Sequence, residues 1–339
     1  MSVVEERAGL RVTHDLAMES GIMWSFFMRI SLPHMRFRLS QHFHHPYLLL
    51  MLTTLFWSGN MVLGRAIRDD VPPLSLAFWR WAIALALTLP LALPHLRTQW
   101  PLLKRGWKAI TVLGLLGVGG YNTLAYIALQ YTTATNAALL NSFIPIATIA
   151  LSWVFLKKHL SRIEWMGVLL SLSGVIAIVS RGDLSILATL SPNVGDLWML
   201  GAVLTWAIYT MGLQWRPIGV HPMLMLAAFT VVGLLVLAPA YAWEISQGRL
   251  ITVSAGSLAG IAYAGFLPGF LGYIFYNRAV AEVGASKASL FIHLMPVFGT
   301  LLSALLLHEI PHGYHYVGIA LIFAGITLTT VALPRLKKQ

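Results

Sequence analysis

The residue best placed to bind a charged ligand is Arg80, which stands alone inside the apolar run 74–94. All 12 acidic residues are expected in loops or tails, so no carboxylate of an apolar run can pair with it. A guanidinium presents a planar set of N–H donors that matches a carboxylate. The sequence therefore predicts that Arg80 favours an anionic or zwitterionic ligand. The alternative is an arginine near a helix end whose side chain reaches the polar interface.

A second candidate is the run His308-Glu309-Ile-Pro-His312, which matches the H-E-x-x-H pattern of zinc metalloproteases. This pattern binds zinc when one continuous helix carries both histidines on one face. Pro311 has no N–H, and its ring would clash with the carbonyl of Leu307, so we expect the helix to end there. We expect no metal at this site, and a membrane-embedded zinc protease is the alternative from another class.

Aromatic and amide side chains recur within the apolar runs. Amides inside a bilayer need partners, so they face other helices or a wet cavity. His293 is the intramembrane group that would titrate near neutrality, and a core histidine with satisfied hydrogen bonds is favoured over a proton carrier. Besides Arg80, the predicted substrate pathway comprises Trp57, Asn60, Tyr121, Asn122, Asn141, Trp206, Tyr209, Tyr273, Asn277 and His293.

Membrane-spanning helices must position these residues. The chain has 339 residues, of which 58% are hydrophobic and 10% charged, whereas soluble domains carry about a quarter charged residues. This composition excludes a soluble enzyme and a nucleic-acid binder, and the absence of cysteine excludes disulfides and thiol catalysis. Ten apolar segments after Pro46 each approach the ~20 residues that a span needs. The predicted spans are 47–66, 74–94, 108–130, 134–156, 163–180, 195–214, 222–243, 257–279, 286–307 and 314–333.

The charges predict the orientation of these spans. Most of the 23 lysines and arginines fall in alternate connections and in the two termini, and few fall in the other set. Because cytoplasmic loops collect lysine and arginine, both termini are predicted to be cytoplasmic, in a multi-pass protein of the cell inner (plasma) membrane. The net charge of +11 is then an orientation signal rather than a sign of a polyanionic partner. The few basic residues in the other set of connections are Arg65, Arg68, Arg181 and Arg249.

An internal repeat appears when residues 126–179 are aligned with 277–330 at a constant offset of 151. Each half then holds five spans, and the odd number predicts that the second copy inserts upside down. The predicted parts are a cytoplasmic extension 1–45, a first repeat 46–181, a second repeat 195–333 and a cytoplasmic tail 334–339. Pro145 and Pro296 are matched, and we expect mid-helix kinks there that serve a gate or only fit the packing. Further matched pairs are Ala128 with Ala279, Gly167 with Gly318, and Gly174 with Gly325.

The run Leu55-Phe-Trp-Ser-Gly-Asn60, followed by Pro72-Pro-Leu-Ser-Leu-Ala-Phe-Trp-Arg80, resembles the opening of an EamA repeat of the drug/metabolite transporter superfamily. The resemblance covers about residues 47–333. It implies a ten-helix, two-repeat permease for small metabolites, commonly an exporter of amino acids or related compounds. Such repeats usually place a glutamate after their fourth helix, which is Glu309 in the second half but Lys158 in the first. If this glutamate helps to close a gate, the two gates differ.

The sequence thus predicts an all-α integral membrane permease rather than an enzyme. Its ten transmembrane helices form two inverted five-helix repeats, and it exports amino acids or related carboxylate-bearing compounds by alternating access. The expected partners are the lipid bilayer and a small-molecule substrate, with no nucleic acid, cofactor or metal, in a monomer or homodimer. The alternative within transport is uptake of an organic anion or a nucleoside.

Overall fold

The computed structural model describes residues 45–188, 193–306 and 310–331, and all regular elements of these residues are helical. Ten helical stretches are long and apolar enough to cross a membrane, which confirms the predicted number. All ten belong to one compact unit that begins at Pro46. The predicted extension, apart from His45, and the predicted tail 334–339 lie outside the described residues.

Six spans consist mainly of one helix each. These are α2 (Pro46–Ala66), α3 (Pro73–Arg105), α8 (Arg162–Val179), α10 (Val194–Gly212) with the 3₁₀ turn η4 (Leu213–Trp215), α11 (Pro222–Ser246) and α16 (Gly313–Val331). A short helix, α9 (Ser185–Ala188), lies in the connection that follows α8.

Four spans are divided into segments, and two of them contain a π-helix. The third span is α4 (Trp107–Gly114), π-helix η3 (Leu115–Gly120) and α5 (Tyr121–Tyr131), and the eighth is α12 (Ala255–Ala264), π-helix η5 (Gly265–Leu271) and α13 (Gly272–Val283). The fourth is α6 (Ala134–Asn141) and α7 (Ile144–Leu156), and the ninth is α14 (Ala285–Leu290), η6 (Phe291–His293) and α15 (Leu294–Leu306). π-Turns are rare and widen the backbone locally, which frees carbonyl groups for other donors.

Helix α3 runs through three prolines, so the predicted end of the second span at Pro94 is wrong. Pro90, Pro94 and Pro101 all lie inside the helix, which ends at Arg105. A proline removes one backbone hydrogen bond without forbidding the next turn, and membrane helices tolerate that loss where neighbouring groups compensate.

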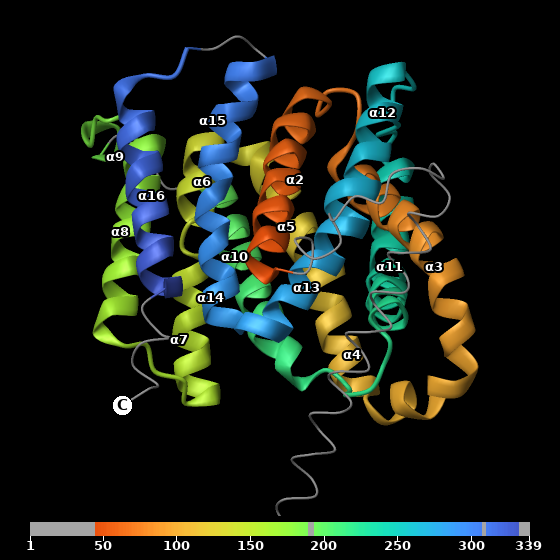
Figure 1. Ribbon diagram of the computed structural model, residues 1–339. Helices are drawn as coiled ribbons and strands as arrows, with labels where there is room; N and C mark the ends of the chain where they lie inside the picture. Colours follow the sequence, from red (N-terminus) through yellow and green to blue (C-terminus); the bar gives the residue numbers. More distant parts are fainter. Residues whose placement is uncertain (1–44, 189–192, 307–309, 332–339) are drawn as a thin grey trace, which may run out of the picture. The chain divides into compact units, whose positions relative to one another are not determined.

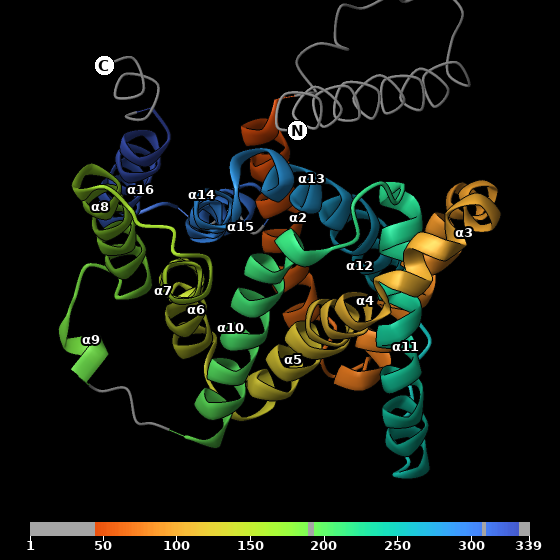
Figure 2. The same cartoon turned by 90° about the horizontal axis from the view of Figure 1, so that it is seen from below.

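Helices α2, α5, α8, α11 and α15 all end at one end of this unit, at the top of Figure 1, which we call the upper end. The start of α2 lies at the opposite, lower end. Seen along the helices in Figure 2, α8 and α16 form a pair on one side, and α3 and α11 pack together on the other. Helices α2, α5, α10, α13 and α15 lie between these pairs.

Glycines bring α8 and α16 into backbone contact. A Cβ atom on Gly325 would lie 2.4 Å from the carbonyl oxygen of Gly167 and 2.5 Å from the backbone nitrogen of Ser171. A Cβ atom on Gly174 would lie 2.5 Å from the carbonyl oxygen of Gly318. The two helices are therefore antiparallel, because the earlier glycine of α8 faces the later glycine of α16. Small residues allow such close approach in membrane helices.

Glu244 corrects the expectation that every acidic residue lies in a loop or tail. It lies inside α11, is 1% exposed and accepts hydrogen bonds from the start of α3. Its carboxylate receives the backbone N–H of Leu74 at 3.1 Å and of Ser75 at 2.7 Å, together with the Ser75 hydroxyl at 2.8 Å. The first N–H groups of a helix lack partners within it and favour a negative charge, which accounts for this buried carboxylate.

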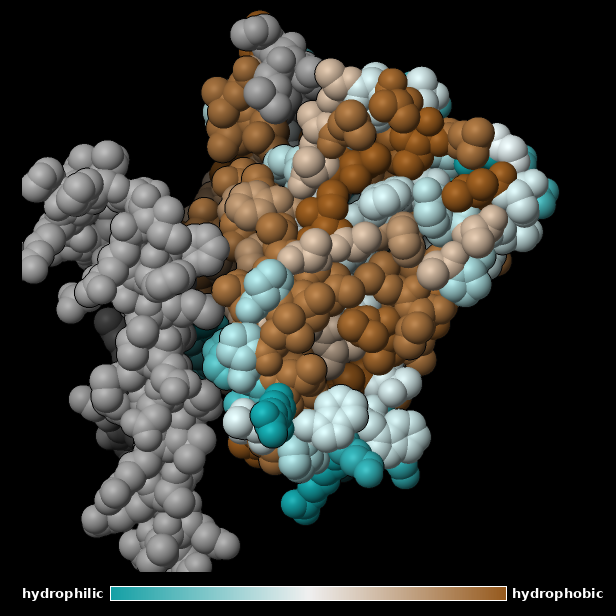
Figure 3. Space-filling model, turned by 90° about the vertical axis from the view of Figure 1, so that its right-hand side faces the viewer, coloured by the Kyte–Doolittle hydropathy of each residue, from teal (hydrophilic) through white to brown (hydrophobic). Residues whose placement is uncertain are grey.

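The outer surface of the bundle is apolar, as a lipid-facing surface must be. Figure 3 shows the face with α3, α11 and α12, where hydrophobic residues cover the middle and the most hydrophilic ones gather towards the lower end. Large exposed side chains of α3, α11 and α12 include Leu89, Leu93, Leu235 and Leu258. Polar side chains buried within the bundle include Asn60, Arg80 and Asn122.

Candidate transport pathway

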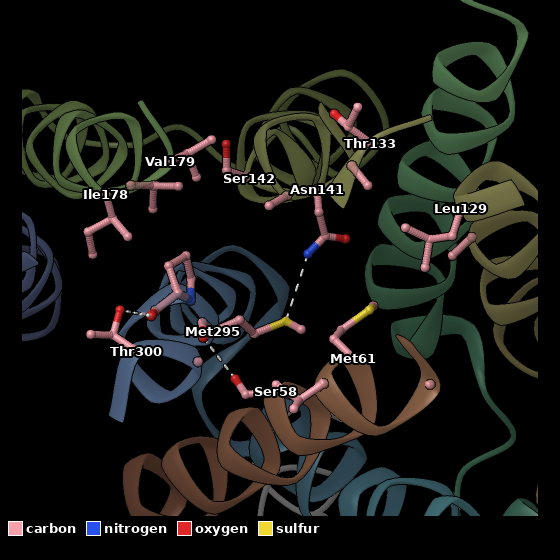
Figure 4. A pocket seen from close by; sticks show the side chains of 18 of the residues that line it. Ser58, Met61, Leu129, Thr133, Asn141, Ser142, Ile178, Val179, Met295 and Thr300 are labelled. Carbon is pink, nitrogen blue, oxygen red and sulfur yellow. Dashed lines mark hydrogen bonds between the residues drawn. The ribbon is translucent and has the colours of Figure 1, made fainter. Parts of the chain in front are cut away.

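A cavity of about 1000 Å³, which we call the vestibule, enters the bundle from the upper end. Residues of the upper-end connections line its mouth, among them Arg68, Thr132 and Arg181. Deeper side chains come from α2, α5, α6, α8 and the ninth span, and Figure 4 shows several of them around the open space. Of the predicted pathway residues, Asn141 and His293 line this vestibule, as does Pro296.

A second, much smaller cavity of about 20 Å³, which we call the chamber, collects most of the predicted pathway residues. Met61, Ile292 and Met295 line both cavities and therefore form the boundary between them. Seven predicted residues line the chamber: Trp57, Asn60, Arg80, Tyr121, Asn122, Trp206 and Tyr273.

Arg80 is buried in the bundle, with 1% of its surface exposed, so it does not reach towards the interface. Its Nη1 donates to Oδ1 of Asn122 at 2.9 Å and to the hydroxyl of Tyr126 at 3.2 Å, and Nη2 donates to the carbonyl of Pro268 at 3.3 Å. The guanidinium also lies 5.5 Å from the centre of the Trp81 ring. Nη1 thus has two acceptors and Nη2 has one, whereas Nε is buried without a hydrogen-bond partner. The Nε edge is the part of Arg80 left for a ligand.

The two π-helices supply carbonyl groups to this network. Pro268 of η5 accepts from Nε1 of Trp57 at 3.2 Å as well as from Arg80, and Gly117 of η3 accepts from the Tyr273 hydroxyl at 2.6 Å. Gly117 and Pro268 are related by the repeat offset of 151. Both halves therefore use the same backbone position to anchor side chains of the pathway.

Aromatic rings pack between the chamber and the lower end. The ring of Trp206 lies 5.0 Å from that of Trp57, at 90° to it, and within 5.6 Å of Tyr273. Tyr276 packs on the same two indoles at 5.1 and 5.3 Å. Edge-to-face and tilted ring pairs at these separations are favourable beyond the area they bury. Trp57, Trp206 and Tyr273 line the chamber, so the cluster surrounds it with closely packed rings.

His293 has both ring nitrogens paired. Its Nε2 donates to the carbonyl of Ser142 at 2.9 Å, and its Nδ1 lies 2.8 Å from the hydroxyl of Ser171. The side chain is 1% exposed and joins η6 to α8 and to the break between α6 and α7. This geometry is that of a core histidine that holds three spans together.

Two predicted pathway residues lie away from both cavities. Tyr209 and Asn277 pair with each other at 2.7 Å and line neither the vestibule nor the chamber.

The two prolines also differ from expectation, because each lies in the first turn of a new helix, where its missing N–H costs nothing. The predicted mid-helix position of Pro145 and Pro296 is therefore wrong: the spans are already broken before them.

The candidate zinc motif and the second gate residue fall largely outside the described residues, which omit His308 and Glu309. Ile310–His312 are not helical, and α16 begins at Gly313, so His312 does not continue the helix of α15. Among the described residues, no group of three or more His, Asp or Glu side chains is placed to hold a metal.

The sequence analysis missed several residues of the site. Tyr126 bridges Arg80 to Asn60, whose Nδ2 donates to the Tyr126 hydroxyl at 3.1 Å. It could have been found, since it follows Asn122 by one helical turn and therefore shares its face. The same spacing links Met61 to Trp57. The role of the Pro268 carbonyl could not have been predicted from the sequence, because this carbonyl is available only through a π-turn.

The vestibule is electropositive. Arg68 and Arg181 line its mouth, and its described lining residues include no aspartate or glutamate. Arg68 has an exposed partner in Asp69 at 3.5 Å, which is screened by solvent and worth little. A cavity walled by one sign of charge raises the local concentration of the opposite sign, and these arginines are the charges that an entering solute would meet at the mouth.

Comparison with protein families accords with this architecture. The EamA-like transporter family model matches residues 45–180 and, a second time, residues 193–331. The chain therefore belongs to the EamA-like transporter family and is a multi-pass membrane protein of a family that transports small molecules.

Relatives support the same class. The chain is 27% identical to the uncharacterized transporter YyaM of Bacillus subtilis, over 86% of this chain and 95% of the relative. It is 30% identical to the uncharacterized transporter YdfC of the same organism, with coverage of 83% and 90%. A probable terminal-alkyne amino-acid exporter of Streptantibioticus cattleyicolor is 25% identical, with coverage of 82% and 91%. A solved crystal structure with 20% identity shares the fold, with a TM-score of 0.69 over 86% of this chain and 98% of that one.

Proposed function

We propose that this protein exports small carboxylate-bearing metabolites, amino acids or related acids, by alternating access. The observation that carries the proposal is the buried guanidinium of Arg80, a residue that lines the chamber and whose Nε has no hydrogen-bond partner. A charged side chain in the middle of a membrane costs at least ~2.5–3.5 kcal/mol on insertion scales, so its retention indicates a function. A carboxylate would supply both the missing acceptor and the opposite charge.

The orientation in this proposal places the upper end outside the cell and both termini in the cytoplasm of the plasma (inner) membrane. The distribution of lysine and arginine supports it, because the connections and termini at the lower end hold most of them. The vestibule then faces outward, and the aromatic cluster closes the pathway on the cytoplasmic side. Movement of cargo requires a second state with the opposite opening.

We also propose that the two halves are inverted repeats. The contact between α8 and α16 supports this, because these helices correspond under the repeat and meet antiparallel at their own matched glycines. The matched anchoring carbonyls of Gly117 and Pro268 support it as well. Two similar, oppositely oriented halves can exchange conformations and so expose a central site to each side in turn. The direction of transport, export, is supported by the relative that is named a probable terminal-alkyne amino-acid exporter.

Single-cysteine labelling tests whether the vestibule opens outward. Because the sequence contains no cysteine, an introduced cysteine is the only thiol that can react. Leu129→Cys, on the vestibule wall, is expected to react with a membrane-impermeant maleimide in intact cells. Lys158→Cys, at the lower end, is the control and should react only after the membrane is permeabilised. Labelling of Lys158→Cys in intact cells, with Leu129→Cys protected, would reverse the proposed orientation.

A further inference from the structure

The chamber offers unpaired N–H donors to a ligand, whereas each side-chain oxygen that lines it already has a hydrogen-bond partner. Nε of Arg80 has no partner. Nε1 of Trp206 has none at hydrogen-bonding geometry either, although the Tyr276 hydroxyl, which pairs with Thr210 at 3.1 Å, lies close to it. Both donor side chains are at most 2% exposed. A buried donor without an acceptor costs about 1–3 kcal/mol, so the chamber is suited to a ligand that accepts.

The oxygen atoms around the chamber are already hydrogen-bonded. Oδ1 of Asn122 accepts from Arg80 at 2.9 Å, and the Tyr273 hydroxyl donates to a backbone carbonyl at 2.6 Å. The Tyr121 hydroxyl donates to Oδ1 of Asn141 at 2.7 Å, and the amide of Asn60 is paired with Tyr126. An ammonium group, which only donates, would find no carboxylate among the described residues that line the chamber, and only oxygens that already have a hydrogen-bond partner.

The size of the chamber limits what can enter it. Its volume is about 20 Å³, and a cavity needs about 10–15 Å³ to hold one water molecule. The chamber is therefore only slightly larger than one water molecule, so at most a small terminal group of a cargo, such as a carboxylate, could enter it. The remainder of such a cargo would stay in the vestibule, which is about fifty times larger on the same measure.

The boundary between the two cavities is apolar. It is formed by Met61, Ile292 and Met295, and Figure 4 shows Met61 of α2 and Met295 of α15 reaching towards each other. Methionine side chains are flexible enough to let a narrow group pass. With a carboxylate in the chamber, the α-carbon of the cargo and its substituents lie at this boundary. A charged α-ammonium there loses water without gaining an ionic partner.

We propose that the chamber is a carboxylate subsite formed by Nε of Arg80 and Nε1 of Trp206, and that the cargo enters it carboxylate first. The preferred cargo class is therefore a carboxylic acid without an α-ammonium group, ahead of the matching α-amino acid. This inference rests on the proposed function and narrows its substrate class.

Two sets of matched compounds test the inference by thermal unfolding of the purified full-length protein in detergent at pH 7.5. One set is 4-methylpentanoate, L-leucine and 3-methylbutylamine, and the other is 3-phenylpropionate, L-phenylalanine and 2-phenylethylamine. A ligand that binds the folded state raises the free energy of unfolding by RT ln(1 + [L]/Kd), so each titration of Tm gives an affinity. We expect the acid of a set to bind about tenfold or more tightly than its amino acid, and the amine not to bind.

A substitution at the boundary supplies a second readout. Glutamine in Met61→Gln has a similar length to methionine and adds an amide oxygen. This variant should therefore narrow the difference in affinity between the acid and its amino acid at least severalfold. Met61→Leu adds no acceptor and is the control that should leave the difference intact. Equal binding of acid and amino acid by the native protein overturns this inference and leaves the proposed function in place. Binding of the amines alone, or of none of the six compounds, counts against the inference and the proposed function together.

Discussion

Replacing Arg80 with glutamine is expected to lower transport of carboxylate cargo by about tenfold to a hundredfold, and to leave any neutral cargo much less affected. A hydrogen bond to a charged group contributes ~1.5–3 kcal/mol, and every 1.4 kcal/mol corresponds to a tenfold change in affinity. Glutamine keeps a polar amide at this position but removes the charge that a carboxylate would meet. The measurement is initial uptake in proteoliposomes for a carboxylate and for a neutral compound of similar size.

Arg80 also holds the bundle together, so the control must separate structure from recognition. Tyr126→Phe removes one partner of the guanidinium while its charge remains. We expect Tyr126→Phe to retain carboxylate transport within about threefold, well under one tenfold step of 1.4 kcal/mol. Both variants should be monodisperse in detergent. An equal loss for carboxylate and neutral cargo in a well-folded Arg80→Gln protein would refute the role of Arg80 in recognition.

The second large effect concerns the contact between α8 and α16. Gly325→Ala is expected to destabilise the protein by about 1–3 kcal/mol, the usual cost of overpacking. The new Cβ would lie 2.4 Å from the carbonyl oxygen of Gly167, and backbone atoms cannot move aside as a flexible side chain can. Thermal unfolding in detergent should show a Tm lower by several degrees.

Gly201→Ala provides the matched control within α10. A Cβ atom there would meet Leu124 at 3.5 Å, an ordinary van der Waals contact. Since alanine is the better helix former, this variant should be neutral or slightly stabilised. If Gly325→Ala and Gly201→Ala have the same Tm, the two helices are not packed backbone to backbone.

The spans could be predicted because a bilayer imposes a length and a composition on any helix that crosses it. The interruptions within spans could not. The α3 helix continues past Pro94, whereas the fourth span is broken before Pro145, although both places carry a proline in an apolar run. Whether a proline ends a helix depends on the groups that take over the lost hydrogen bond, and those come from other spans.

Residues of the site could be predicted where a polar or charged group inside a bilayer must have a partner or a function. An arginine among apolar residues must be paired or functional, which identified Arg80, and amides in a bilayer must find partners, which identified Asn60 and Asn122. Sequence alone could not foresee the contacts across spans. Glu244 looks like a loop residue because it lies near a predicted span end, yet it caps the start of α3 from a distant part of the chain.

The central claim is that the pathway accepts carboxylates, and counterflow tests it most directly. Proteoliposomes containing the purified protein are loaded with an unlabelled compound and placed in a trace of the same compound in labelled form. The compounds are carboxylic acids, amino acids, nucleosides and organic cations. The account predicts that labelled carboxylates accumulate transiently, above protein-free liposomes, and that nucleosides and cations do not. Accumulation of nucleosides or cations, with none of the carboxylates, would contradict it.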